Sequence, residues 1–181
     1  MKRKKNKIKE YLFVDGYNII NYWKSLKDKS LISFEEAREE LIEVLAEYHH
    51  YSGIEIIIVF DAHLVQGNNG KEYYYKGIQV VYTKESETAD NYIERKLDDL
   101  GRVRKIRVAT SDWLEQQIIL SRGGTRISAR ELEIEVYNAK NRLNKKRGNK
   151  NHQNNMELGR LDKDVLNKLS KWQESTKTDI D

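Results

Sequence analysis

The chain has 181 residues, of which 38% are hydrophobic and 34% are charged, and it contains no cysteine. This length suits one domain with extensions, and the absence of cysteine excludes disulfide bonds, thiolate zinc sites and thiol catalysis. No apolar run is long enough to span a membrane, and no apolar signal-peptide core follows the basic N-terminus. We therefore expect a cytoplasmic protein with no membrane partner.

Charge is divided unevenly along the chain. Residues 1–10 contain six basic and one acidic residue, and residues 138–181 contain eleven basic and six acidic residues. Residues 11–137 contain sixteen basic and twenty-two acidic residues, so an acidic central part lies between two basic ends. We predict a basic N-terminal lead at 1–10, a main domain at 11–137, and a basic, partly helical C-terminal extension at 138–181.

The extension opens with a strongly basic segment, because six basic residues and no acidic residue lie between Asn138 and Lys150. Basic clusters bind polyanions by releasing counterions, largely without sequence preference. We therefore predict contact with nucleic acid, although a solvated tail that aids solubility is the alternative. The residues expected to make this contact are Arg142, Lys145, Lys146 and Arg147, with further phosphate contacts from Arg102, Arg104, Lys105 and Arg107.

The first half of the chain predicts two strands separated by a helix. Short apolar runs predict strands at 11–15 and 54–61. Ser33, with Glu36 three residues later, has the pattern of a capping box, and Gly53 is suited to end the helix that follows. The segment 16–32 is polar, and residues 62–76 are expected to form a long connection.

The second half continues the alternation of strands and helices. Strands are predicted at 78–82 and 106–109, and helices at about 87–100, after Ser111, and after Ser128, which forms a second capping box with Glu131. A further amphipathic pattern covers 158–172. This alternation predicts an α/β fold with a largely parallel central sheet and helices on both of its faces.

Acidic residues stand where the predicted strands stop. They are Asp15, Asp61, Asp90 and Asp112. An open α/β sheet builds its site at the carboxyl ends of its strands, and carboxylates gathered there repel one another unless a hard divalent cation lies between them. Oxygen ligands favour Mg²⁺ or Mn²⁺. Each acid alone has an ordinary structural explanation, since Asp-Gly is a common turn pair and Asp112 suits a helix N-terminus.

Other residues beside these acids extend the predicted site. Glu87 and Asp90 share one face of a helix, and Glu87 or Asp61 is expected to assist the metal directly or through water. Gly16 is expected to allow a sharp turn after Asp15. Three further side chains are expected near the substrate: Asn18, Thr110 and Ser111. No phosphate-loop, dinucleotide or HExxH motif is present, so we predict no small-molecule cofactor.

Four segments taken together resemble the YacP-like branch of the NYN-domain family, which belongs to the PIN-like nucleases. These segments are LFVDGYNII, VFDAH, ETADNYIE and VATSDW. The resemblance runs from Tyr11 through the helix that begins at Ser128. It implies a PIN-like (NYN) fold and an endoribonuclease that depends on Mg²⁺ or Mn²⁺.

The resemblance also implies roles for individual residues. Asp15 and Asp90 match the essential acids of the family, and Asp112 matches the acid of its TSD segment, which makes these three the predicted catalytic and metal-binding residues. The implied substrate is messenger RNA, cut in association with the translating ribosome. The alternative is a module of the same fold that binds RNA or ribosomes without cleaving. A phosphatase is disfavoured, because Asp15 is followed by Gly-Tyr and not by the DxD pair that such an enzyme needs.

Overall fold

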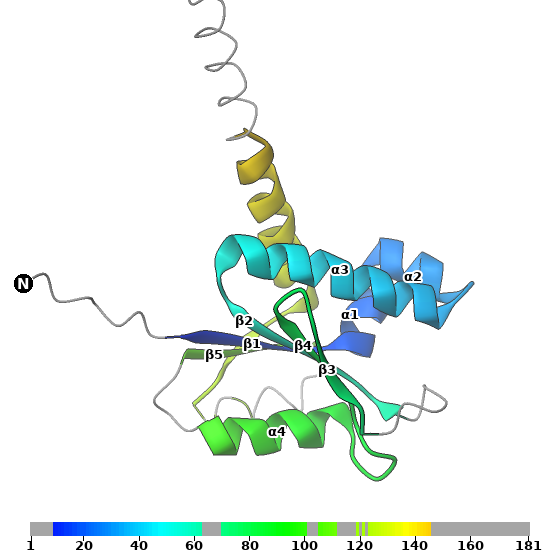
Figure 1. Cartoon of the computed structure of the whole chain (residues 1–181), viewed down its shortest axis with the longest axis vertical. Helices are drawn as coiled ribbons and strands as arrows, with labels where there is room; N and C mark the ends of the chain where they lie inside the picture. Colours follow the sequence, from blue (N-terminus) through cyan, green and yellow to red (C-terminus); the bar gives the residue numbers. More distant parts are fainter. Residues whose placement is uncertain are drawn as a thin grey trace, which may run out of the picture. The chain divides into compact units, whose positions relative to one another are not determined.

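The structure is a computed structural model, and the residues that it describes are 9–62, 70–100, 105–111, 119, 121 and 123–145. Internal contacts divide the chain into two units, Met1–Ala139 and Lys140–Asp181. The architecture described here is that of the first unit, a six-stranded sheet with helices on both faces (Figure 1). It confirms the predicted α/β class.

The sheet has the strand order β3-β4-β2-β1-β5-β6. All neighbouring strands are parallel except β3 and β4, which are antiparallel. The carboxyl ends of β4, β2, β1 and β5 therefore lie side by side along one edge, which we call the carboxyl edge. The strands are β1 (Glu10–Asp15), β2 (Glu55–Phe60), β3 (Glu72–Tyr75), β4 (Ile78–Tyr82), β5 (Lys105–Ala109) and β6 (Thr125–Ile127).

The central strands β1 and β2 are apolar and buried between their ends, because both of their faces are covered. Successive side chains in a strand point to opposite faces. In β1, Leu12 and Val14 enter one buried cluster, whereas Phe13 enters the other. The sheet therefore separates two hydrophobic cores.

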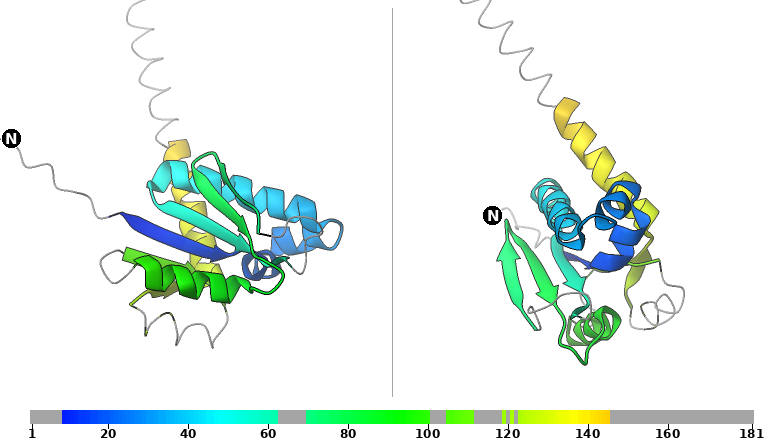
Figure 2. Two further views of the ribbon diagram at one scale, coloured as in Figure 1. Left: turned by 60° about the horizontal axis from the view of Figure 1, so that its bottom comes forward. Right: turned by 90° about the vertical axis from the view of Figure 1, so that its right-hand side faces the viewer.

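Helices cover both faces of the sheet, as the views of Figure 2 show. The first core is covered by α1 (Gly16–Tyr22), α2 (Lys24–Ser30), α3 (Phe34–Ser52) and the start of a helix at residues 129–145. The second core is covered by α4 (Ala89–Leu100). None of the helices in the described part of the chain is long and apolar enough to cross a membrane.

Both predicted helix caps are present. The Ser33 side chain accepts a hydrogen bond from the Glu36 N–H (3.2 Å), and Gly53 ends α3 in the left-handed conformation at φ 68°. At the second site, Glu131 accepts from the Ser128 N–H (2.8 Å) while Ser128 Oγ accepts from the Glu131 N–H (3.2 Å). This reciprocal pair is a complete capping box.

The predicted long connection at 62–76 is wrong at its C-terminal end. Residues 72–75 form β3, which pairs with β4 through a two-residue turn at Lys76 and Gly77. Both turn residues have positive φ, 45° and 94°, as a primed hairpin turn requires. The Lys-Gly pair is a weaker signal than Asn-Gly, which explains the omission. The three-residue strand β6 and the short helices α1 and α2 were likewise not predicted.

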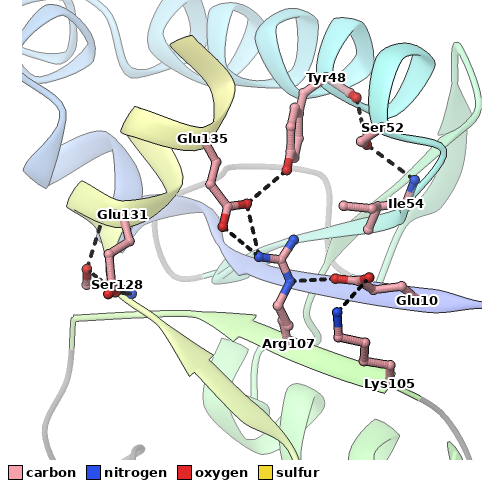
Figure 3. Close-up of polar contacts among 9 residues, drawn as sticks. All are labelled: Glu10, Tyr48, Ser52, Ile54, Lys105, Arg107, Ser128, Glu131 and Glu135. Atoms are coloured by element: carbon pink, nitrogen blue, oxygen red, sulfur yellow. Dashed lines mark hydrogen bonds and ion pairs between the residues drawn. The ribbon is translucent and has the colours of Figure 1, made fainter. Parts of the chain in front are cut away.

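A cluster of ion pairs joins the other end of the sheet to the helices (Figure 3). Arg107 of β5 lies between two carboxylates, with Nε 2.8 Å from Glu10 Oε1 and Nη1 2.9 Å from Glu135 Oε2. The Tyr48 hydroxyl of α3 donates to the same Glu135 oxygen (2.9 Å). Lys105 Nζ lies 3.1 Å from Glu10. The half-enclosed Arg107 is therefore engaged within the domain, which argues against its expected phosphate contact, whereas the expected contact of the exposed Lys105 stays a prediction.

Replacing Arg107 should destabilise the domain far more than replacing Lys105, although both pair with Glu10. The Arg107 side chain is 13% exposed and the Lys105 side chain 64% exposed. Losing a buried cation leaves its carboxylates without compensation, so we expect Arg107→Gln to lower the free energy of unfolding by about 2–4 kcal/mol. Lys105→Gln should cost less than about 0.5 kcal/mol. Urea denaturation of both variants measures the difference, and equal losses would contradict it.

Candidate active site at the carboxyl edge

The carboxyl edge brings together the segments that carry the predicted acids. Asp15 is the last residue of β1, and Asp61 directly follows the last residue of β2. Asp90 lies in the first turn of α4, the helix that follows β4. Because β4, β2 and β1 are adjacent and parallel, these three acids come from neighbouring positions on one edge.

Asp15 is held at the start of α1. Its Oδ1 accepts a hydrogen bond from the Asn18 N–H (3.1 Å), so the carboxylate caps the helix. Burial raises the pKa of Asp15 from 3.8 to about 6, against the lowering effect of the Asn18 bond, and the negative charges of Asp90 and Asp61 raise it further. Asp90 and Asp61 therefore both act on Asp15 electrostatically.

Gly16 is needed for a reason that differs from the prediction. It is not among the residues with positive φ, so no sharp turn depends on it. Instead, a Cβ at this position would lie 2.3 Å from the ring of Phe60. The glycine allows β2 and the start of α1 to approach closely, and this contact places Asp15 against the residue that precedes Asp61.

Asn18 connects Asp15 with the end of β5. Its side-chain oxygen accepts a hydrogen bond from the Ser111 N–H (2.9 Å), while its own N–H bonds to Asp15. The Ser111 N–H therefore has a partner inside the protein, while the expected contact of its side chain with the substrate stays a prediction. Thr110 is fully buried and its N–H donates to Ile127 (3.2 Å), which argues against the predicted contact of its side chain with RNA. Asp112 lies outside the described residues.

The start of α4 presents Asp90 beside a small pocket. Thr88 Oγ1 accepts from the Asn91 N–H (3.2 Å) and caps the helix. Asp90 and Glu94 line the pocket with apolar neighbours, namely Ile93, Val108 and Ile119. Glu87, predicted to assist a metal, instead has Oε1 2.7 Å from Nη2 of Arg95. One oxygen of the Glu87 carboxylate is therefore engaged by an arginine.

The described residues do not by themselves form a complete metal site. Among them, no group of three or more Asp, Glu or His side chains is arranged to hold an ion. The predicted third catalytic acid, Asp112, is outside this part of the chain. The assignment of Asp15, Asp90, Asp112, Glu87 and Asp61 as metal ligands therefore stays a prediction.

The remaining predicted contacts lie on the helix at residues 129–145 or beyond it. Arg142 and Lys145 are exposed on this helix, whereas Lys146 and Arg147 lie outside the described residues. One positioning residue was not predicted at all. Thr83, which is buried, accepts a hydrogen bond from the Ala62 N–H (3.0 Å) and so orients the chain just after Asp61. No periodicity marks such a residue in the sequence.

The raised pKa of Asp15 predicts that its contribution to folding stability falls as pH rises. The folded protein holds the Asp15 proton up to about pH 6, whereas the unfolded chain releases it near 3.8. This contribution is therefore fully present below about pH 4 and is lost as pH rises through 6. Asp15→Asn keeps the helix cap and removes the charge, so we expect it to stabilise the metal-free protein at neutral pH by about 1–3 kcal/mol.

Urea denaturation in the presence of EDTA, repeated across this pH range, measures the effect. The gain should disappear in acid, where Asp15 of the parent is also neutral. Asp28, which is exposed on α2, provides the control, and Asp28→Asn should show no comparable gain. A stability difference for Asp15→Asn that does not change with pH would contradict the burial of an ionised group.

Comparisons with known proteins agree with this architecture. Residues 12–174 match the model of the YacP-like NYN domain. The chain is 42% identical over 164 residues to the uncharacterized protein YacP of Bacillus subtilis (strain 168), covering 90% of this chain and 96% of that protein. The matched region includes most of the predicted C-terminal extension but not the N-terminal lead.

Solved structures of similar sequence have the same fold. The crystal structure of Rae1 (YacP) from Bacillus subtilis superposes with a TM-score of 0.70 at 42% identity, covering 91% of this chain and 94% of that chain. The structure of a point mutant of Rae1 gives a TM-score of 0.67 at 44% identity, covering 75% and 80% of the two chains. The fold is PIN-like, of the NYN type found in the PIN-like nuclease superfamily, whose members typically use divalent metals. With its sequence match and its fold in agreement, the chain belongs to the YacP-like NYN-domain family.

Proposed function

We propose that this protein is a divalent-metal-dependent endoribonuclease that cleaves messenger RNA in association with the translating ribosome. The observation that carries the proposal is that Asp15 is largely buried beside two other acids. Burial and the charges of Asp90 and Asp61 raise its pKa to about 6. Ionised Asp15 is unfavourable at the carboxyl edge unless a cation lies beside it. The edge is therefore well suited to binding a cation.

The donor set fits Mg²⁺ or Mn²⁺. All the candidate ligands are carboxylates, which are the ligands that hard cations prefer. Asp15 and Asp90 would hold the ion together with Asp112, with Asp61 or Glu87 in support. A bound cation supplies charge neutralisation at the phosphodiester and makes a water molecule easier to ionise. Asn18 would keep Asp15 and the segment before Asp112 in register through its two hydrogen bonds.

The charge distribution supports delivery of the RNA by a larger assembly. The central part of the chain is acidic, so it attracts free RNA poorly, while the two ends are basic. Basic ends suit a partner rich in phosphate, such as the ribosome. We therefore infer that the ends bring the domain to ribosomes and that the carboxyl edge then acts on the message.

The alternative is a module that binds RNA or ribosomes without cleaving. The two proposals differ in their dependence on acids and on metal, and the same experiment separates them.

Cleavage should require both the acids and active translation. We expect the parent protein to produce new ends in a labelled message during translation in vitro, and Asp15→Asn and Asp90→Asn to reduce this rate by at least about 100-fold, because each removes a ligand charge. EDTA should abolish cleavage. Primer extension on the translated message and on the same RNA alone measures both requirements.

Binding measurements make the outcomes distinct. The Asp15→Asn and Asp90→Asn proteins should still sediment with ribosomes, and Mn²⁺ should raise the melting temperature of the parent but not of these variants. Unchanged cleavage by both variants would contradict the metal site. Equal cleavage of translated and free RNA would contradict ribosome delivery. Sedimentation with ribosomes and no new ends under any metal would establish the non-catalytic module.

The basic segment should contribute salt-dependent binding. We expect neutralisation of Arg142, Lys145, Lys146 and Arg147 to weaken binding to ribosomes and to lower the slope of log affinity against log salt by up to about 0.7–0.9 for each lost phosphate contact. Sedimentation at several salt concentrations measures the slope. A slope equal to that of the parent would show that this segment makes no phosphate contact.

A further inference from the structure

Arg38 of α3 differs from Arg95 and Arg107 in the partner of its guanidinium and resembles Arg126 of β6, whose Nε donates to the Thr110 carbonyl (3.3 Å). Four glutamates flank it in the sequence, and Glu35 lies three residues before it, where a helical ion pair would form. Among the described residues, no carboxylate lies within 4.0 Å of its guanidinium, whereas Arg95 and Arg107 are both ion-paired. Arg38 Nη1 instead donates to the hydroxyl of Tyr17 (3.1 Å). Its hydrogen bond is thus to a neutral group, and its charge is not cancelled by an ion pair.

The hydroxyl of Tyr17 lies close to the carboxyl edge. Tyr17 is in α1, two residues after Asp15, and its ring packs edge-on against Phe60 with the centroids 5.4 Å apart. Phe60 is the last residue of β2 and directly precedes Asp61. The hydrogen bond to the Tyr17 hydroxyl therefore holds the Arg38 guanidinium near the ends of β1 and β2, which carry Asp15 and Asp61.

Two further phenols complete the surroundings of Arg38. Tyr73 of the edge strand β3 stacks on Tyr82, the last residue of β4, with the ring centroids 6.4 Å apart. Burial raises the pKa of Tyr73 to about 12, the neighbouring Tyr82 hydroxyl adds to this, and Arg38 opposes it. Tyr82 stacks in turn on Phe60, with the ring centroids 5.5 Å apart, and Phe60 is the ring against which Tyr17 packs. Arg38, Tyr17, Tyr73 and Tyr82 form what we call the Arg38 cluster.

We propose that the Arg38 cluster binds a backbone phosphate of the RNA strand next to the phosphodiester presented to Asp15, Asp61 and Asp90. A polyanion approaching three carboxylates is repelled, so its neighbouring phosphate needs a cation beside them. A guanidinium binds phosphate through two parallel N–H bonds, and phenol hydroxyls supply further donors.

This inference rests on the proposed function but concerns different residues. The basic segment that opens the extension was expected to contact nucleic acid from its sequence alone. Arg38 was not, because it stands in a glutamate-rich helix whose net charge is negative. The cluster adds a local phosphate contact at the site to the long-range attraction of the basic ends.

Fluorescence anisotropy with a short labelled single-stranded RNA tests the cluster. Every variant is made in the full-length Asp15→Asn protein, so that the RNA is not cut. Arg38→Gln should weaken binding by about tenfold and lower the salt slope by about 0.7, the value for one phosphate contact on a single strand. Tyr17→Phe keeps the ring packing and should weaken binding about threefold, since only one hydroxyl is lost.

Two further variants separate a phosphate contact from a structural effect. Arg38→Lys keeps the charge but not the planar fork, so its salt slope should match the parent while its affinity is intermediate. Arg130→Gln removes an exposed arginine at the start of the helix at 129–145 and should change neither quantity. Urea denaturation identifies variants that fail to fold, and the lysine variant then decides the outcome.

The results distinguish this inference from the proposed function. If the Asp15→Asn parent binds no RNA, the phosphate contact is wrong, and the proposed function, which relies on delivery by the ribosome, is decided by the cleavage assay on the translated message. If the parent binds RNA and Arg38→Gln binds it with the same affinity and salt slope, the phosphate contact is wrong and the proposed function stands. A loss of affinity in Arg38→Gln equal to that in Arg130→Gln would also overturn the contact, since it would reflect net charge alone.

Discussion

The rest of the structure depends on the parallel pairing of β1 with β2 on one side and with β5 on the other. β1 lies at the centre of the sheet, between two hydrophobic cores, so its direction and register are determined by burial on both faces. Because β4 adds in parallel beyond β2, four strands end at one edge. The chain must leave this edge in turns and helix starts, and those are the places where Asp15, Asp61 and Asp90 are held.

The position of Asp15 disfavours its ionised form, and this helps to explain its proposed role as a metal ligand. A carboxylate that accepts a hydrogen bond at a helix start is normally stabilised. Here burial and two like charges outweigh that effect, and the pKa of Asp15 rises to about 6. In the metal-free protein, the ionised form of Asp15 is therefore destabilised at the edge where the fold brings the acids together. The packing of Gly16 against Phe60 holds Asp15 in place in either charge state. The electrostatic destabilisation therefore arises at the site and not in the core.

Arginines near the two ends of the sheet have different partners. At the amino end, Arg107 is enclosed by Glu10, Glu135 and the Tyr48 hydroxyl, so its charge is used to join β1, β5, α3 and the helix that follows β6. At the carboxyl end, Arg38 is held by a phenol beside the acids. A cation with carboxylate partners stabilises the domain, whereas a cation held by a neutral group can still bind an anion.

The local signals in the sequence determined the central strands, the capped helix α3, and the acids that end β1 and follow β2. These depend on short-range physics: apolar runs need burial, and caps satisfy backbone N–H groups within a few residues. The tertiary structure alone decided what depends on residues far apart in the chain. The ring of Phe60 explains why residue 16 is a glycine, and the Ser111 N–H explains what the Asn18 side chain does. The ion pairs with Glu10 and Glu135 explain why Arg107 is unavailable to RNA. The strands β3 and β6 were missed for the same reason, since strands this short are stabilised by the neighbours with which they pair and carry little periodicity of their own.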